Sequence, residues 1–110
     1  MKLFAALRKI REFERLQLTF FKALLDFDII IEIGYAQEQN QPITPKKLFL
    51  LNLSSLTTVR RRLAKLIEQG IVIRRTNAND RRSSILTISP SSHRLLGKYG
   101  SMLTAASAAL

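Results

Sequence analysis

Arginine and lysine residues gather at two places in the second half of the chain. Three consecutive arginines, Arg60, Arg61 and Arg62, lie in a segment whose apolar residues recur at helical spacing. Arg81 and Arg82 lie in a polar stretch between two β-branched runs. A guanidinium donates paired hydrogen bonds to phosphate oxygens, and it can grip guanine in the same bidentate way. These residue types therefore favour binding of a phosphate-rich polymer.

The net charge of +10 is confined to one part of the sequence. Residues 1–40 contain six basic and six acidic residues, whereas residues 41–110 contain twelve basic residues and two acidic ones, Glu68 and Asp80. A basic surface gains affinity for nucleic acid because binding releases condensed counterions. The segregated charge therefore indicates a nucleic-acid partner.

Several other function classes find little support. The chain has no cysteine, which excludes disulfides, thiolate nucleophiles and iron–sulfur clusters. His93 is the only histidine, so we expect it to be structural or solvent-facing, with no metal site and no cofactor. No nucleophile–base pair and no phosphate-cradling glycine loop is visible, which predicts a protein that is not an enzyme. The longest apolar stretch, residues 20–35, contains four charged residues, so we expect a cytoplasmic protein without a membrane partner.

The elements that position the basic residues follow from apolar periodicity and helix caps. Residues 2–18 predict an amphipathic helix, and residues 19–39 predict a buried central helix that ends before Pro42. The aromatic residues expected in the core are Phe20, Phe21, Phe27 and Tyr35. Thr44-Pro45 predicts the start of a short helix that ends near residue 51, because threonine caps helices and proline suits the first helical position.

A turn at residues 52–54 leads to a further helix at residues 55–69, with Ser55 as its N-cap and Gly70 as its left-handed stop. One face of this helix is apolar and is predicted to pack inward: Leu56, Val59, Leu63, Leu66 and Ile67. The opposite face is polar and basic. Runs at residues 71–73 and 84–88 predict a hairpin with arginines on its arms and tip.

A last helix is predicted from residue 91 to 110, with interruptions near Gly97 and Gly100. The fold class expected is mainly α with a small β-hairpin, an α+β fold. A helix, a tight turn, a basic helix and then a basic hairpin is the order of a winged helix-turn-helix domain, in which the second helix of the motif enters the major groove. The wing is expected at residues 74–84.

At this point the sequence resembles the MarR family of bacterial and archaeal transcription regulators. The resemblance runs without a gap over residues 55–96 and more loosely over residues 42–54. It rests on Ser55, Thr58-Val59, Leu66, Gly70-Ile71-Val72, Arg74-Arg75, Asp80-Arg81-Arg82 and Ile88-Ser89. The chain departs from the family pattern at Phe49, where a small residue is usual, and at Leu53, where the turn often has glycine.

The resemblance implies roles for individual residues. Ser55 opens the recognition helix, and Thr57, Thr58 and Arg61 would face base edges. Arg60, Arg62 and Lys65 would reach flanking phosphates. Arg81 or Arg82 would enter the minor groove, with Asp80 orienting one of them by a charge-assisted bond. The remaining contacts to the DNA backbone would come from Lys46, Lys47, Arg74 and Arg75. The two lysines could equally be surface residues that make no contact with DNA.

The function expected is sequence-specific binding of double-stranded DNA by a homodimeric transcription regulator. Within a single winged-helix domain, residues 1–40 would provide dimer interface and core, residues 41–89 the helix-turn-helix and wing, and residues 90–110 the C-terminal helix. The family often binds a small-molecule effector, but the sequence does not show a pocket for one. Two alternatives stay open: a non-specific module that binds chromosomal DNA or RNA, and a winged helix that docks a protein partner.

Overall fold

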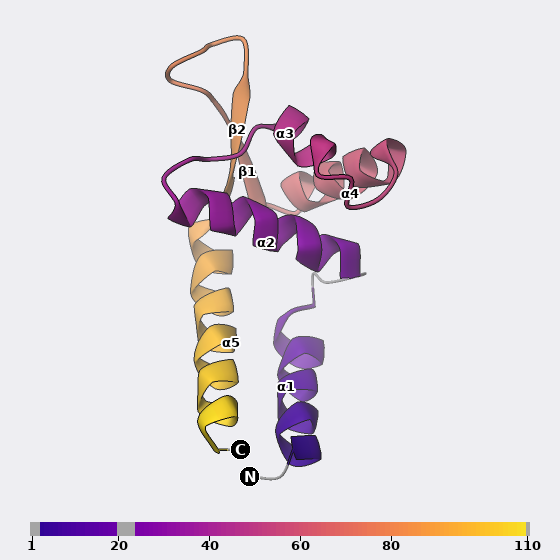
Figure 1. The fold of residues 1–110 in the computed structure, drawn as a ribbon, viewed down its shortest axis with the longest axis vertical. Helices are drawn as coiled ribbons and strands as arrows, with labels where there is room; N and C mark the ends of the chain where they lie inside the picture. Colours follow the sequence, from indigo (N-terminus) through magenta and orange to yellow (C-terminus); the bar gives the residue numbers. More distant parts are fainter. Residues whose placement is uncertain (1–2, 20–23, 110) are drawn as a thin grey trace. The chain divides into compact units, whose positions relative to one another are not determined.

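The computed structural model describes residues 3–19 and 24–109. The chain divides into two compact units, one formed by residues 1–21 and 90–110 and the other by residues 22–89. Five helices and one two-stranded antiparallel sheet make up the described residues (Figure 1). The predicted fold class, mainly helical with a small β-hairpin, is confirmed.

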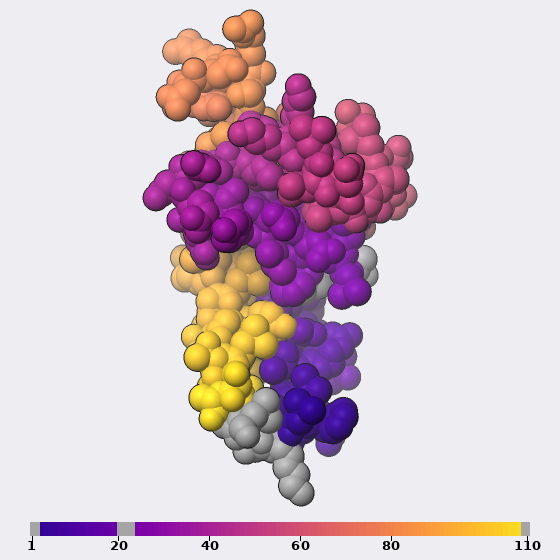
Figure 2. All heavy atoms as spheres, in the orientation of Figure 1, coloured from indigo at the N-terminus to yellow at the C-terminus, as the bar shows by residue number. Residues whose placement is uncertain are grey.

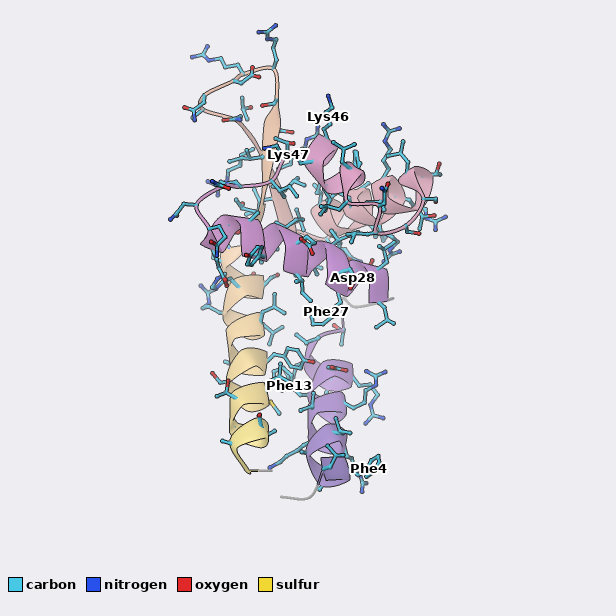
Figure 3. The ribbon with its side chains drawn as sticks, viewed as in Figure 1. Phe4, Phe13, Phe27, Asp28, Lys46 and Lys47 are labelled. Atoms are coloured by element: carbon cyan, nitrogen blue, oxygen red, sulfur yellow. The ribbon has the colours of Figure 1, made fainter. Side chains whose placement is uncertain are left out.

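The first unit consists of two antiparallel helices, α1 (Leu3–Gln17) and α5 (Pro90–Ala109). The ring of Phe13 stacks on that of Tyr99 with 5.9 Å between the centroids, and Phe13 points from α1 toward α5 (Figure 3). The Tyr99 hydroxyl donates a hydrogen bond of 2.5 Å to Glu14 Oε1. Burial, together with this bond to a carboxylate, raises the pKa of Tyr99 to about 12.

Helix α5 is continuous, and the predicted interruptions at Gly97 and Gly100 are wrong. A Cβ atom added at either glycine would meet no atom within 4 Å, so neither glycine is required by close packing. An isolated glycine costs a helix only about 1 kcal/mol relative to alanine. The two glycines therefore weaken the helix without breaking it.

The second unit is built around α2 (Leu24–Glu38), which contacts α3 (Pro45–Leu50), α4 (Leu56–Glu68) and strand β2 (Ser84–Ile88). The second unit also contains strand β1 (Val72–Thr76). Each of the five elements contributes fully buried apolar side chains, less than 2% exposed, to the core of this unit: Ile29, Ile33, Leu48, Val59, Leu66, Val72 and Leu86. The core of the unit thus lies where α2, α4 and the hairpin meet.

Helix α2 buries one face and leaves the other open, contrary to the prediction that most of it is covered. Tyr35 is 60% exposed and Phe27 is half-buried, so the prediction that Tyr35 lies in the core is wrong. Ile33 is fully buried, and Tyr35, two positions further on, lies about 200° around the helix from it. The predicted core residues Phe20 and Phe21 lie outside the described residues.

The predicted cap at Thr44 sets the start of α3, and a tight turn follows the end of this helix. The Thr44 hydroxyl accepts a hydrogen bond of 3.2 Å from the Lys47 amide, and Pro45 occupies the first position of α3. The turn between α3 and α4 places Asn52 in the left-handed region with φ of 54°. Asparagine tolerates this conformation better than most residues, so Asn52 suits the left-handed position of this turn.

The hairpin is antiparallel and pairs Val72 with Ile88 at one end and Thr76 with Ser84 at the other. Strand β1 thus extends to Thr76, three residues beyond the apolar run that predicted it. The Leu86 amide also donates to the Ile43 carbonyl at 2.9 Å, which ties the segment before α3 to β2. The tip of the hairpin protrudes from the second unit (Figure 2).

No helix in the described ranges combines the length and the apolar character that crossing a membrane requires.

Candidate nucleic-acid interface

Helix α4 has one buried face and one exposed basic face. Val59, Leu63 and Leu66 are at most 3% exposed and pack into the core of the second unit. Burying each such side chain contributes roughly 1.5–3 kcal/mol, which fixes the rotation of the helix. The residues thereby turned toward solvent are Thr57, Arg60, Arg61, Ala64, Lys65 and Glu68. Leu56 was expected to pack inward, but it is 48% exposed because it lies in the first turn.

Ser55 and Thr58, at the start of α4, are joined by two hydrogen bonds. The Ser55 hydroxyl accepts a hydrogen bond of 3.3 Å from the Thr58 amide and donates one of 2.8 Å to Thr58 Oγ1. The donor of Ser55 is therefore used by the cap, whereas Thr58 keeps its own O–H. Next to this pair, Leu56 and Thr57 are exposed. An exposed leucine can contact the C5-methyl group of thymine, and a threonine hydroxyl can bond to a base edge.

The three consecutive arginines of α4 have three different environments. The guanidinium carbon of Arg60 lies 5.4 Å from the centroid of the Phe49 ring, which belongs to α3. Arg61 is exposed, and within the described residues it makes no ion pair. Arg62 turns inward to Asp26 on α2. Only two of the three are therefore placed to contact a ligand.

The phosphate contact predicted for Arg62 does not fit this structure. Its Nε and Nη2 atoms donate to Asp26 Oδ1 and Oδ2 at 2.7 and 2.6 Å, and the Asp26 side chain is fully buried. These hydrogen bonds raise the pKa of Arg62 above its ordinary value. A buried carboxylate needs a paired charge, and this requirement keeps the guanidinium in place. Arg62 is therefore a structural residue of α4.

The tip of the wing is organised by Asp80. Its Oδ1 atom accepts a hydrogen bond of 3.0 Å from the Arg82 amide and lies 3.8 Å from Arg82 Nε. The Ser83 amide and hydroxyl both donate to the Asp80 carbonyl, at 3.1 and 3.2 Å. Asp80 thus orients Arg82 through the backbone and through charge, while the Arg82 side chain stays 97% exposed. Arg81 is exposed beside it.

The arms of the hairpin and the first helix of the motif add further basic groups. Arg74 Nε donates to Ser84 Oγ at 2.8 Å across the two strands, and Arg75 is exposed. Lys46 and Lys47 are exposed on α3 (Figure 3). Lys65 lies 3.9 Å from Glu68 on the exposed face of α4. Apart from Arg62, every predicted basic residue is thus on the surface of the second unit.

The sequence did not predict the contact of Phe49 with Arg60, the left-handed backbone of Asn52 or the exposure of Leu56. The signal for Phe49 is its departure from the family pattern, since an aromatic residue stands where a small one is usual. Asn52 could have been identified as the left-handed residue because asparagine adopts positive φ more readily than leucine does.

In the described part of the chain, no group of three or more His, Cys, Asp or Glu side chains is placed to hold a metal ion.

Comparison with known proteins finds similarity in structure only. No family model matches the chain, and no curated protein matches it. Among solved structures, a mutant MarR from E. coli complexed with operator DNA has a TM-score of 0.60 at 19% identity, over 91% of this chain and 69% of that one.

Two further structures agree. The transcriptional regulator Tm0710 from Thermotoga maritima has a TM-score of 0.63 at 24% identity, over 87% of this chain and 68% of that one. A mutant MepR from S. aureus has a TM-score of 0.64 at 16% identity, over 96% and 79% of the two chains. The chain therefore has the winged-helix fold of MarR-family regulators.

Proposed function

We propose that this winged-helix chain is a cytoplasmic transcription regulator that binds double-stranded DNA in a sequence-specific way, and that it is not an enzyme. Helix α4 lies in the major groove, where Thr57, Thr58 and Arg61 face base edges. Arg82, and with it Arg81, reaches the minor groove from the wing. Lys46, Lys47, Arg60, Lys65, Arg74 and Arg75 contact the DNA backbone.

The observation that carries this proposal is the difference between two neighbouring arginines of α4. Arg62 is used by the fold, whereas Arg61 is exposed and has no protein partner within the described residues. Arginine that is free on the outer face of such a helix can grip guanine O6 and N7, which discriminates by about 1–3 kcal/mol. The mutant MarR from E. coli, which is similar in fold, was solved in complex with operator DNA, and this supports DNA as the ligand of the present chain.

The proposed regulator is a homodimer, in which a second molecule of the same chain binds through α1. On α1, Leu3, Phe4 and Leu7 are 51, 79 and 47% exposed. Phe4 lies on the side of α1 away from α5 (Figure 3). Leu3 and Leu7 lie about one helical turn apart, and exposed large apolar side chains grouped in this way are typical of an interaction site. In a two-fold symmetric dimer, two recognition helices about 34–36 Å apart would read the two halves of a pseudo-palindromic site.

Selection of bound duplexes from a random pool tests the DNA-binding proposal. We expect the bound pool to converge on a sequence with two related half-sites. A pool that binds without converging supports the non-specific alternative, and absence of binding to any duplex at low salt supports the protein-docking alternative. Either result contradicts the proposal.

Sedimentation velocity at micromolar concentration tests the dimer separately. We expect the wild type and Phe4→Leu to sediment as dimers and Phe4→Glu to sediment as a monomer, because a buried unpaired carboxylate is costly. A monomeric wild type contradicts the dimer. The small-molecule effector that the resemblance implies stays a prediction.

A further inference from the structure

Phe49 and Arg60 join the two helices of the helix-turn-helix motif. The Arg60 guanidinium lies over the Phe49 ring, 5.4 Å from its centroid. Phe49 is half-buried on α3, and Arg60 is exposed on α4. Within the described residues no carboxylate pairs with Arg60, so the aromatic ring is the group that holds its guanidinium.

A cation–π contact of this kind leaves the hydrogen-bonding capacity of arginine unused. The attraction acts between the face of the ring and the positive charge, so it uses none of the N–H donors. An arginine in such a contact can therefore still donate to a phosphate. Its side chain has also lost rotamer freedom before DNA arrives, and this reduces the entropy cost of binding.

The side of α4 on which Arg60 is held decides what it can reach. Phe49 belongs to α3, the first helix of the motif, and in this motif the first helix crosses the DNA backbone while the second reads the groove. A guanidinium held against α3 is thus directed to the backbone. Arg61 has no such partner and remains directed away from the core.

We propose that Phe49 is a positioning residue that preorganises Arg60 for contact with a DNA phosphate. This inference rests on the proposed function and deepens it. It assigns a purpose to the aromatic residue at a position where a small residue is usual in the family that the sequence resembles.

A double-mutant cycle on DNA affinity tests the inference with the full chain and a duplex from the selected pool. Phe49→Leu keeps an apolar side chain but removes the aromatic face, and Phe49→Tyr keeps the face. We expect Phe49→Leu to weaken binding about two- to tenfold, and Phe49→Tyr to bind like the wild type. In an Arg60→Ala background, Phe49→Leu should cause no further loss.

The salt dependence and an NMR measurement separate positioning from a merely structural role. Arg60→Ala should reduce the slope of log affinity against log salt by about one, whereas Phe49→Leu should leave the slope unchanged because the phosphate is still contacted. In the free protein, the Arg60 Nε–H order parameter should be higher in the wild type and in Phe49→Tyr than in Phe49→Leu.

Equal losses from Phe49→Leu with and without Arg60 overturn the inference, as does an Arg60 order parameter that Phe49→Leu leaves unchanged. In both cases the proposed function stands, because the wild type still binds its duplex. Failure of the wild type to bind any duplex overturns the proposed function and this inference together.

Discussion

The Asp26 carboxylate on α2 accepts two hydrogen bonds, at 2.7 and 2.6 Å, from the guanidinium of Arg62 on α4. Asp26 is fully buried, and the two residues are 36 positions apart in the sequence. A bidentate pair has one favourable geometry, so it fixes the rotation of α4 about its own axis. That rotation determines which side chains α4 presents to solvent.

Breaking this pair should destabilise the protein strongly. Removing one partner of a buried ion pair leaves a buried charge uncompensated, which costs about 3 kcal/mol or more. We therefore expect Arg62→Met, which removes both hydrogen bonds to the fully buried Asp26 carboxylate, to lower the free energy of unfolding by that order, measured by urea denaturation. The double variant Asp26→Leu/Arg62→Met should recover most of the loss, because no charge is then buried. A loss in Arg62→Met below about 1 kcal/mol contradicts a stabilised buried pair.

The burial of Tyr99, together with its hydrogen bond to Glu14, predicts a loss of stability at high pH. The pKa of Tyr99 is about 12 in the folded chain against an ordinary 10.0, so the folded state favours the protonated phenol. Its contribution is complete below pH 10.0 and is lost as the pH rises through about 12. Tyr35 is the only other tyrosine, so Tyr35→Phe allows Tyr99 to be titrated alone by tyrosinate absorbance. A midpoint near 10.0 contradicts the buried and hydrogen-bonded environment of Tyr99, and Tyr99→Phe should abolish the pH effect.

Substitution by alanine should change the stability of the protein in opposite directions at Gly70 and at Gly97. Gly70 has φ of 74°, and a Cβ there meets no atom within 4 Å, so Gly70→Ala suffers only from backbone strain of about 1–2 kcal/mol. Gly97 lies inside α5 with equal space around it, so Gly97→Ala should stabilise the protein by about 0.5–1 kcal/mol. Thermal unfolding measures both. Changes of the same sign in the two variants contradict this account.

The contacts of Asp80 predict a local effect at the wing. In Asp80→Ala the Arg82 amide loses its acceptor, so its hydrogen exchange should accelerate. The global free energy of unfolding should change by less than about 0.5 kcal/mol, because Asp80 is exposed. Asp80→Asn is the matched control, since its side-chain oxygen can still accept the bond. Equal exchange of the Arg82 amide in the wild type and Asp80→Ala shows that Asp80 does not organise the wing.

Local signals in the sequence predicted the elements well. Thr44-Pro45 and Ser55 mark the starts of α3 and α4, because caps act on the amides three residues away. Gly70 marks the end of α4, because it adopts a positive φ. These interactions lie within a few positions of each other, so a single sequence contains all that is needed to predict them.

Long-range partners were not predictable in the same way. Arg62 and its neighbours Arg60 and Arg61 are identical in type, and only the fold shows that Asp26 approaches one of them. The exposure of Tyr35 depends on which elements pack against α2, which periodicity alone does not decide. The structure shows that the predicted basic residues other than Arg62 are exposed, and their contacts with DNA stay a prediction. The phosphate contact predicted for Arg62 conflicts with its hydrogen bonds to Asp26.

The central claim is that the outer face of α4 reads DNA sequence, and Arg61→Ala tests it most directly. The measurement is the ratio of dissociation constants for an unrelated duplex and a selected duplex of equal length. Arg94→Ala is the control, because it also removes one exposed positive charge but lies on α5. We predict that Arg61→Ala lowers this ratio about tenfold or more and that Arg94→Ala leaves it unchanged. Equal weakening of both duplexes by Arg61→Ala would contradict the claim.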